Sequence, residues 1–400
     1  MKRKLPRSLS LVLSLVILAS LVLSGCSSSE NVPQQTDAAE TENVIKLGVF
    51  EPLTGADAGG GQLEYDGMLA AQNARPTVMM DGKEYKIEFV VADNKSDDVE
   101  SVTAAESLVS QGVAMVLGGS GSSRCIAAAP TFERAQIPAI GSSCTNPLVT
   151  QGNEYYFRIC FTDNFQGMAV AEYAKNYLGC ETAAIVTDVS DTYCVGLRKF
   201  FIDSFGEEGI VADVKFNKGD QDFSAQINAL IDADADCVFC PSQFTEGALI
   251  QVQAKQLGYE PLWLGADCWD NTVMVDIGGD AVNGCQFSTP FVISDEPDEV
   301  LTKYLDDYAA LFPGEIPKSC GTALGYDAYN VALDAIEIAG CLDGPALKDA
   351  LMEVTTIGVT GAVVFDEEHD AVKDLVFIKK IEDGELVYCT TFHFGDELNG

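Results

Sequence analysis

The chain has 400 residues, of which 47% are hydrophobic, and 61 acidic against 24 basic residues give it a formal net charge of −37. A charge of this sign and size argues against binding to nucleic acid or to an anionic lipid surface. The length and the apolar content are sufficient for two folded domains.

The first 25 residues have the parts of an export signal peptide. Cations between Lys2 and Arg7 precede an apolar run from Leu9 to Leu23, which is short for a membrane-spanning helix. The run ends in Leu-Ser-Gly-Cys26, which resembles a bacterial lipobox, where the cysteine becomes the lipidated first residue. Residues 26–43 are polar and predict a flexible tether. We therefore expect a lipid-anchored, extracytoplasmic protein; the alternative is an uncleaved anchor helix.

From Val44 onward, strand-like and helix-like segments alternate along the chain. The first series predicts strands at 44–50, 85–93, 114–119 and 137–141, with helices at 64–74, 98–112 and 124–135. A second series predicts strands at 182–188, 210–216, 236–240 and 261–267, with helices at 165–179, 196–209, 223–233 and 246–258. Apolar strands separated by helices indicate parallel sheets covered on both faces. The sequence thus predicts an α/β fold with two doubly wound, Rossmann-like lobes.

Polar, glycine-rich segments follow five of the predicted strands, at 51–61, 118–123, 141–147, 187–196 and 265–271. In doubly wound sheets, ligands bind outside the carboxyl ends of the strands. Because three of these segments belong to the first series and two to the second, we expect a ligand between the lobes.

The segment GGSGSS (118–123) places Ser122 where a strand ends and a helix begins. A helix N-terminus offers free N–H groups and partial positive charge to an anion. A nucleotide phosphate is disfavoured, because no lysine completes a Walker loop and Arg124 replaces the last glycine of a Rossmann fingerprint. The G-x-S-x-G motif of a hydrolase nucleophile elbow is missed by one residue. The chain has two histidines, His369 and His393, that could act as the base of such an enzyme. A carboxylate is the favoured guest; the alternative is that Ser122 only caps its helix.

Thirteen cysteines are present, and twelve remain when Cys26 is set apart. Cys237 and Cys240 form a CxxC, but within a predicted strand these positions face opposite sides. With no second CxxC and few histidines, we expect no metal site. Free buried thiols and a few disulfides both remain open.

Ten segments in order resemble the type I periplasmic substrate-binding lipoproteins, in the leucine/isoleucine/valine-binding branch. They include IKLGVFEPLTG, DGMLAAQNA, VLGGSGSS, IPAIGSSCTNPLVT, FSAQINAL, LGADCWDN and GYDAYNVALDAI, and the resemblance runs from about Val44 to Cys389. It implies a monomer whose two lobes, joined by three crossovers, close on a solute that an ABC importer permease then receives. The implied lobes are residues 44–162 with 290–361, and residues 163–289 with 362–391. The implied role involves no catalysis and no cofactor.

Position by position, the resemblance implies an amino-acid site. Ser122, with the backbone near Ser120, matches the group that binds the ligand carboxylate. Thr145 matches a zwitterion-binding threonine, and Ser143 a residue whose carbonyl accepts from the ammonium. Tyr193 matches a tyrosine that closes over the ligand, and Asp267 an acidic residue that pairs with the ammonium.

Two departures from the family pattern bear on the side-chain end of the site. Gln243 and Gly60 stand where aromatic rings are usual, which implies a larger or more polar pocket. Tyr326 and Trp269 are candidate aromatic walls, unless they serve ordinary packing. Alternatives to an amino-acid binder are a binder of a short amide or aromatic acid, a secreted serine hydrolase using Ser122, and a sensory ligand-binding protein.

Overall fold

The computed structural model describes residues 43–393, which belong to one compact unit of the chain. The predicted signal peptide, Cys26 and nearly all of the tether lie outside these residues. Within the described part, no helix is long and apolar enough to cross a membrane.

The first sheet has six strands in the order β2-β3-β1-β4-β5-β6. Its strands are parallel except β2, which pairs antiparallel with β3. Along β1, Ile45, Leu47 and Val49 join one apolar cluster and Phe50 another, so both faces of the strand are buried. The strands are β1 (Val44–Glu51), β2 (Thr77–Met80), β3 (Lys83–Asp93), β4 (Met115–Leu117), β5 (Ala139–Gly141) and β6 (Tyr156–Arg158).

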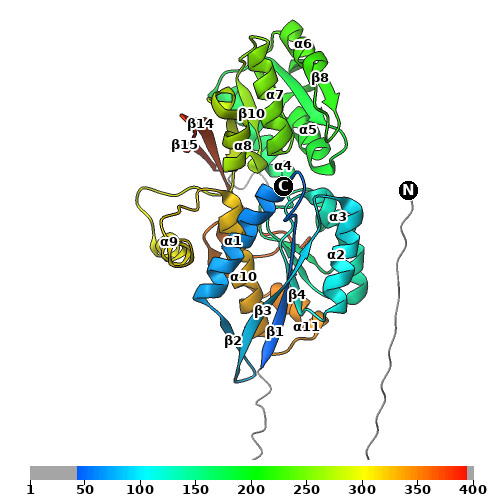
Figure 1. Cartoon of the computed structure of the whole chain (residues 1–400), viewed down its shortest axis with the longest axis vertical. Coiled ribbons are helices and arrows are strands. Elements are labelled where there is room, and N and C mark those ends of the chain that lie inside the picture. Colours follow the sequence, from blue (N-terminus) through cyan, green and yellow to red (C-terminus); the bar gives the residue numbers. More distant parts are fainter. Residues whose placement is uncertain (1–42, 394–400) are drawn as a thin grey trace, which may run out of the picture. The chain divides into compact units, whose positions relative to one another are not determined.

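Helices cover both faces of this sheet (Figure 1). On one face lie α1 (Ala58–Ala74) and α10 (Cys320–Ala339), with α9 (Glu299–Leu311) and α11 (Gly344–Leu351) beside them. On the other face lie α2 (Asp98–Ser110) and α3 (Ser122–Ala135). We call this sheet and its helices the first lobe.

The second sheet has seven strands in the order β15-β14-β11-β10-β9-β7-β8. The strands from β8 to β11 are parallel, and β14 and β15 add antiparallel at one edge. The strands are β7 (Ala183–Asp188), β8 (Ile210–Phe216), β9 (Cys237–Phe239), β10 (Trp263–Gly265), β11 (Gln286–Thr289), β14 (Leu375–Glu382) and β15 (Glu385–His393).

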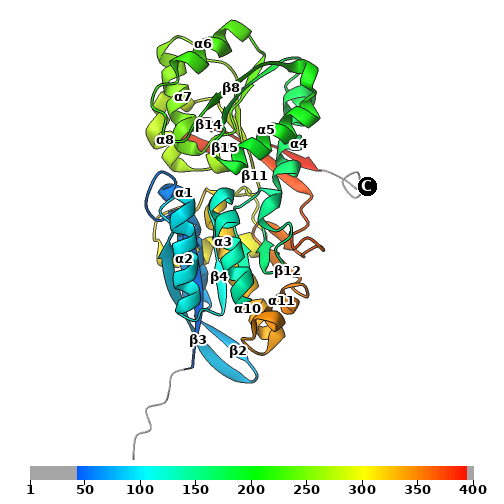
Figure 2. The ribbon, with the colours of Figure 1, turned by 90° about the vertical axis from the view of Figure 1, so that its right-hand side faces the viewer.

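Helices also cover both faces of the second sheet, and together they form the second lobe (Figure 2). One layer holds α4 (Asp163–Glu172) and α5 (Thr192–Phe205). The other holds α6 (Ser224–Ala233), α7 (Phe244–Gln256) and α8 (Thr272–Gly278). The two sheets with their helix layers confirm the predicted α/β fold with two doubly wound lobes.

The chain passes between the sheets after β6, after β11 and before β14. Ahead of the last passage, β12 (Thr356–Gly358) pairs with β13 (Gly361–Val363), and Asp370 still bridges to Arg158 at the end of β6. The residue limits assigned to the lobes stay a prediction.

Two buried ion pairs lie at these passages. The Arg158 guanidinium binds the Asp370 carboxylate at 2.6 Å, and the Lys379 ammonium binds Asp270 at 2.9 Å. Both members of the second pair are at most 5% exposed. The first pair joins the end of β6 to the segment before β14, and the second joins β14 to the loop after β10.

The twelve cysteines of the described residues are all unpaired. Cys237 packs in the cluster under α4 and α5, whereas Cys240 packs in the cluster under α6 and α7. The CxxC therefore spans the sheet, as alternation along a strand predicts.

Candidate ligand-binding site

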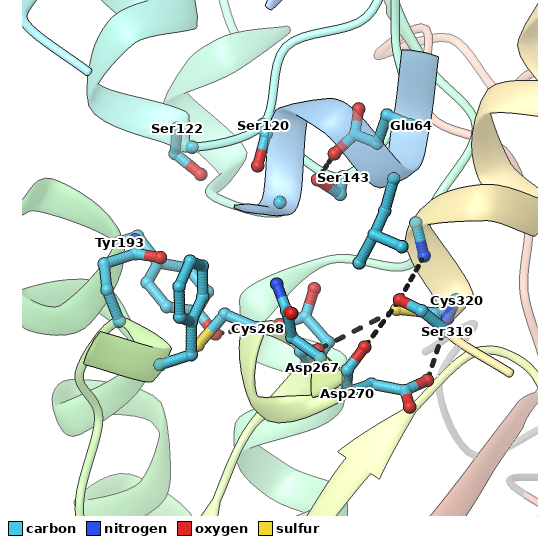
Figure 3. Close-up of a pocket in the computed structure, with 17 residues that line it drawn as sticks. Glu64, Ser120, Ser122, Ser143, Tyr193, Asp267, Cys268, Asp270, Ser319 and Cys320 are labelled. Atoms are coloured by element: carbon cyan, nitrogen blue, oxygen red, sulfur yellow. Dashed lines mark hydrogen bonds between the residues drawn. The ribbon is translucent and has the colours of Figure 1, made fainter. Parts of the chain in front are cut away.

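A cavity of about 40 Å³ is lined by the loops that follow strands of both sheets and by the start of α1, α7 and α10 (Figure 3). Seven of the residues singled out from the sequence line it, namely Gly60, Ser120, Ser122, Ser143, Tyr193, Gln243 and Asp267. The cavity thus lies where the resemblance implies the site.

Ser122 is the first residue of α3, and the turn into the helix needs glycine at 121, where φ is 98°. The Ser122 hydroxyl oxygen accepts a hydrogen bond of 3.1 Å from the Asn146 N–H. Because that bond uses the oxygen as an acceptor, the hydroxyl hydrogen can be donated to a guest in the cavity. A hydroxyl donor at a helix N-terminus suits an anionic guest.

The backbone of the neighbouring loop is already engaged. The N–H groups of Gly119 and Ser120 each donate to the Glu51 carboxyl group at 3.0 Å. The Ser120 amide, implied to bind the ligand carboxylate, is therefore occupied by Glu51. The side chain of Ser120 still lines the cavity.

Glu64, which the sequence analysis did not single out, lines the cavity from α1 and accepts a hydrogen bond from the Ser143 hydroxyl (Figure 3). It lies beside Glu51, and both are at most 1% exposed. Burial and the neighbouring Glu64 raise the pKa of Glu51 well above its usual range. One signal in the sequence could have indicated Glu64: it shares the buried face of α1 with Gly67, Met68 and Ala71.

Asp267 lies after β10 and faces the cavity from the second lobe. The Tyr193 hydroxyl donates to its carboxylate at 2.8 Å, and the residue is 4% exposed. Burial raises the pKa of Asp267 to about 6, and the hydrogen bond from Tyr193 opposes the rise. A buried carboxylate near this pKa, with no cation paired to it among the described residues, suits a cationic guest.

Gln243 and Gly60 both line the cavity, and each has close neighbours there. The Gln243 amide donates to Asp191 at 3.0 Å, at the start of α5. A Cβ on Gly60 would lie 2.8 Å from the Ser120 hydroxyl and 3.7 Å from the ring of Phe244. The Ser120 hydroxyl therefore takes the space that the glycine leaves, and Phe244, another residue that the sequence analysis missed, lines the cavity beside it.

Three candidates lie away from the cavity lining. The Tyr326 hydroxyl donates to Asp307 at 2.6 Å, so its ring faces α9. Trp269 is fully buried against Gly247 and Gly265, which is the packing role considered as its alternative. Thr145 is buried, and its carbonyl accepts from the Asp163 N–H at 2.8 Å.

Other residues that the sequence analysis missed form the end of the cavity near α10. Asp270, Ser319 and Cys320 are tied together there, because the Ser319 hydroxyl and the Cys320 N–H both donate to Asp270. The ion pair with Lys379 compensates the buried charge of Asp270. Leu63, Asn271 and Gly321 complete it.

His369 is not among the residues that line the cavity. Its ring stacks on that of Phe157, with 4.4 Å between the ring centroids. Among residues 43–393, no group of three histidine, cysteine or acidic side chains is arranged to hold a metal ion.

Comparison with known proteins places this geometry among solute-binding proteins. A family model described as periplasmic binding protein matches residues 44–385. A leucine-, isoleucine-, valine-, threonine- and alanine-binding protein of Pseudomonas aeruginosa is 28% identical over 337 residues, 83% of this chain and 88% of the relative.

Two solved structures extend the comparison. The leucine-binding protein LivK of Thermotoga maritima is 34% identical, with a TM-score of 0.83 over 88% of this chain and 99% of that one. The branched-chain amino acid transporter substrate-binding protein LivJ of Streptococcus pneumoniae, in complex with isoleucine, is 29% identical, with a TM-score of 0.80 over 88% of this chain and 99% of that one.

Proposed function

The chain belongs to the periplasmic binding protein family, and we propose that it captures an amino acid between its lobes and delivers it to an ABC importer permease. One observation carries the proposal: a hydroxyl donor at a helix N-terminus, Ser122, and a buried carboxylate, Asp267, line the same cavity from different lobes.

These two groups are complementary to a zwitterion. A ligand carboxylate is stabilised by the Ser122 hydroxyl and the positive end of α3. A ligand ammonium is stabilised by Asp267, which otherwise remains buried without a cation. Because both ends of the solute must be paired in a closed site, a molecule that lacks either group is rejected.

Closure of the two lobes on the solute links solute binding to delivery of the solute to the permease. Hydrogen bonds join the lobes beside the cavity, from Ser123 to Asp191 at 2.8 Å and from Thr245 to the Ala56 carbonyl at 3.2 Å. The Lys218 ammonium reaches Asp57 at 2.7 Å. A solute that contacts both lobes stabilises this closed arrangement, which the permease can distinguish from an open one.

The cellular location of the protein is part of the same proposal. An export signal and a lipidated Cys26 would hold a monomer at the outer face of the bacterial membrane, near its permease. The role we propose is binding and release without chemical change of the solute.

Thermal unfolding of the purified protein with single solutes tests the proposal. A ligand at 100 times its Kd adds about 2.7 kcal/mol of stability, which shifts Tm by several degrees. Each α-amino acid is compared with its analogue lacking the amine and its analogue lacking the carboxylate. The proposal expects a shift only when both groups are present; a shift with an aromatic acid or a short amide alone would contradict it.

A further inference from the structure

We propose that Glu51 and Glu64 share one proton, and that this proton keeps the two first-lobe loops of the cavity in the position that receives the solute. The inference rests on the proposed function. It assigns both glutamates as positioning residues, which act on the solute through Ser122 and Ser143.

The two carboxyl groups are fully buried, in hydrogen-bonding contact with each other. No lysine or arginine is among the main groups that act on either of them. Burial raises the pKa of both groups, and Glu64 raises that of Glu51 further. Two carboxylates in contact without a cation would repel each other strongly in this setting. The pair therefore keeps one proton, which Glu51 holds and donates to Glu64.

The pair is bound to both loops of the first lobe that line the cavity. In the loop after β4, the N–H groups of Gly119 and Ser120 each donate to Glu51 at 3.0 Å. In the loop after β5, the Ser143 hydroxyl donates to Glu64 (Figure 3). Glycine is required at 118, because a Cβ there would lie 2.1 Å from the Glu51 Oε1 atom. A change in the pair is thus passed directly to both loops.

These loops position the group proposed to bind the ligand carboxylate. Ser120 lies two residues before Ser122, the first residue of α3, and the second loop supplies the Asn146 N–H that donates to the Ser122 hydroxyl oxygen. Release of the shared proton to solvent would leave two buried negative charges beside this loop. They would repel each other and the ligand carboxylate, and both effects weaken binding.

The neighbouring titratable groups do not take over the role of the proton. Those around the pair are Asp93, Arg124, Cys125, Cys144, Tyr156 and Cys160. From α10, the residue that packs on Glu64 is Gly321. The Arg124 guanidinium donates to the Ser120 carbonyl, but its charge is paired with Asp57 at 2.9 Å. Burial raises the pKa values of Tyr156 and Cys160 well above their usual ranges, so both stay neutral when the pH rises to 9.

Carbon-13 NMR of protein labelled at its glutamate carboxyl carbons tests the shared proton without any solute. We expect a signal at the chemical shift of a protonated carboxyl group at pH 7, and we expect Glu64→Gln to remove it. In that variant the new amide donates to Glu51, which is then stabilised as a carboxylate by three donors. Wild-type protein without such a signal, or the same set of signals in Glu64→Gln, would overturn the inference.

Calorimetric titration tests the role of the proton in binding, with each of the twenty amino acids at pH 7 and the tightest of them at pH 8 and 9. Linkage to one proton allows at most a tenfold change in affinity for each pH unit. From pH 7 to 9, the wild-type protein should lose about tenfold more affinity than Glu64→Gln, a comparison in which the titration of the solute itself cancels. Asp66→Asn, on α1 but outside the cavity lining, is the matched control and should behave as wild type.

Asp163→Asn is a second control, because burial raises the pKa of Asp163 to about 8, within the same pH range. This variant should keep the tenfold difference from Glu64→Gln. A loss of affinity that is equal in wild type and Glu64→Gln, or that disappears in Asp163→Asn, would overturn the inference and leave the proposed function standing.

If Glu64→Gln fails to fold, Glu51→Gln should remove the same NMR signal and the same loss of affinity at high pH. Binding of none of the amino acids at pH 7 would instead overturn the proposed function and the role of the proton in binding together. The NMR signal would still decide whether the two glutamates share a proton.

Discussion

Lowering the pH from 7 to 5 should weaken amino-acid binding about tenfold, because it protonates the carboxylate proposed to receive the ammonium. Burial raises the pKa of Asp267 from 3.8 to about 6. With that pKa, the group is about nine-tenths ionised at pH 7 and about one-tenth ionised at pH 5. The loss corresponds to about 1.4 kcal/mol of binding free energy.

The Asp267 carboxyl group has the opposite effect on the stability of the protein without ligand: a higher pH favours amino-acid binding but lowers the free energy of unfolding. Because its pKa is higher in the folded than in the unfolded state, the native state binds the proton more tightly. The free energy of unfolding therefore falls as the pH rises from about 4 to 6, by roughly 3 kcal/mol for a shift of about two units. Asp267→Asn should thus raise Tm by a few degrees at neutral pH while it abolishes binding.

Titration calorimetry at pH 5, 6 and 7, together with thermal unfolding, measures both effects. Asp276→Asn, on the exposed side of α8, is the control and should keep the wild-type pH profile. Asp163 lies nearby, but burial raises its pKa to about 8, so it stays protonated over this range. Amino-acid affinity that is unchanged in Asp267→Asn, or a pH profile that survives the substitution, would refute the reasoning.

Three further predictions concern the loop, the lobe contact and the passage between lobes. Ser122→Ala should weaken amino-acid binding by about 1–3 kcal/mol in calorimetry, as expected for a hydrogen bond to a charged group; an unchanged Kd would remove Ser122 from the site. Lys218→Ala removes the ion pair with Asp57, which joins the lobes, and should weaken binding about fivefold, more at low salt than at high salt; a stronger affinity would contradict this role. Asp370→Asn leaves Arg158 fully buried without its charged partner and should lower the free energy of unfolding by about 3–5 kcal/mol in denaturant titration; a loss below about 1 kcal/mol would show that the pair is dispensable.

The fold and one wall of the site could be predicted from the sequence because their signals are local. Alternating strands and helices specify the two sheets, and Ser122 is placed by the strand-to-helix turn in which it lies. Strand ends predict that the segments 187–196 and 265–271 lie at one edge of the sheet, whereas the choice of Tyr193 and Asp267 within them depends on the family resemblance.

The remaining parts of the site depend on contacts that have no local signal. Phe244 lines the cavity because α7 of the second lobe packs beside the first turn of α1, a contact between segments that are far apart in the sequence. Glu64 is paired with Glu51 across the sheet edge, which the helical pattern of α1 does not reveal. Tyr326 was expected to line the site but does not, because the orientation of α10 turns its ring towards α9.

Asp57 has two cationic partners of different kinds, and this bears on how readily the two lobes can part. Arg124, from the same lobe, holds Asp57 at 2.9 Å and is 2% exposed, whereas Lys218 comes from the other lobe and is 29% exposed. When the lobes part, Asp57 keeps Arg124, and Lys218 returns to water that already reaches it. Opening therefore leaves no buried charge without a partner, so breaking this contact costs about the 1 kcal/mol of a partly exposed ion pair rather than the several kcal/mol of an uncompensated buried charge. A carrier that must release its solute to a permease in every cycle benefits from a contact between the lobes that is only of modest strength.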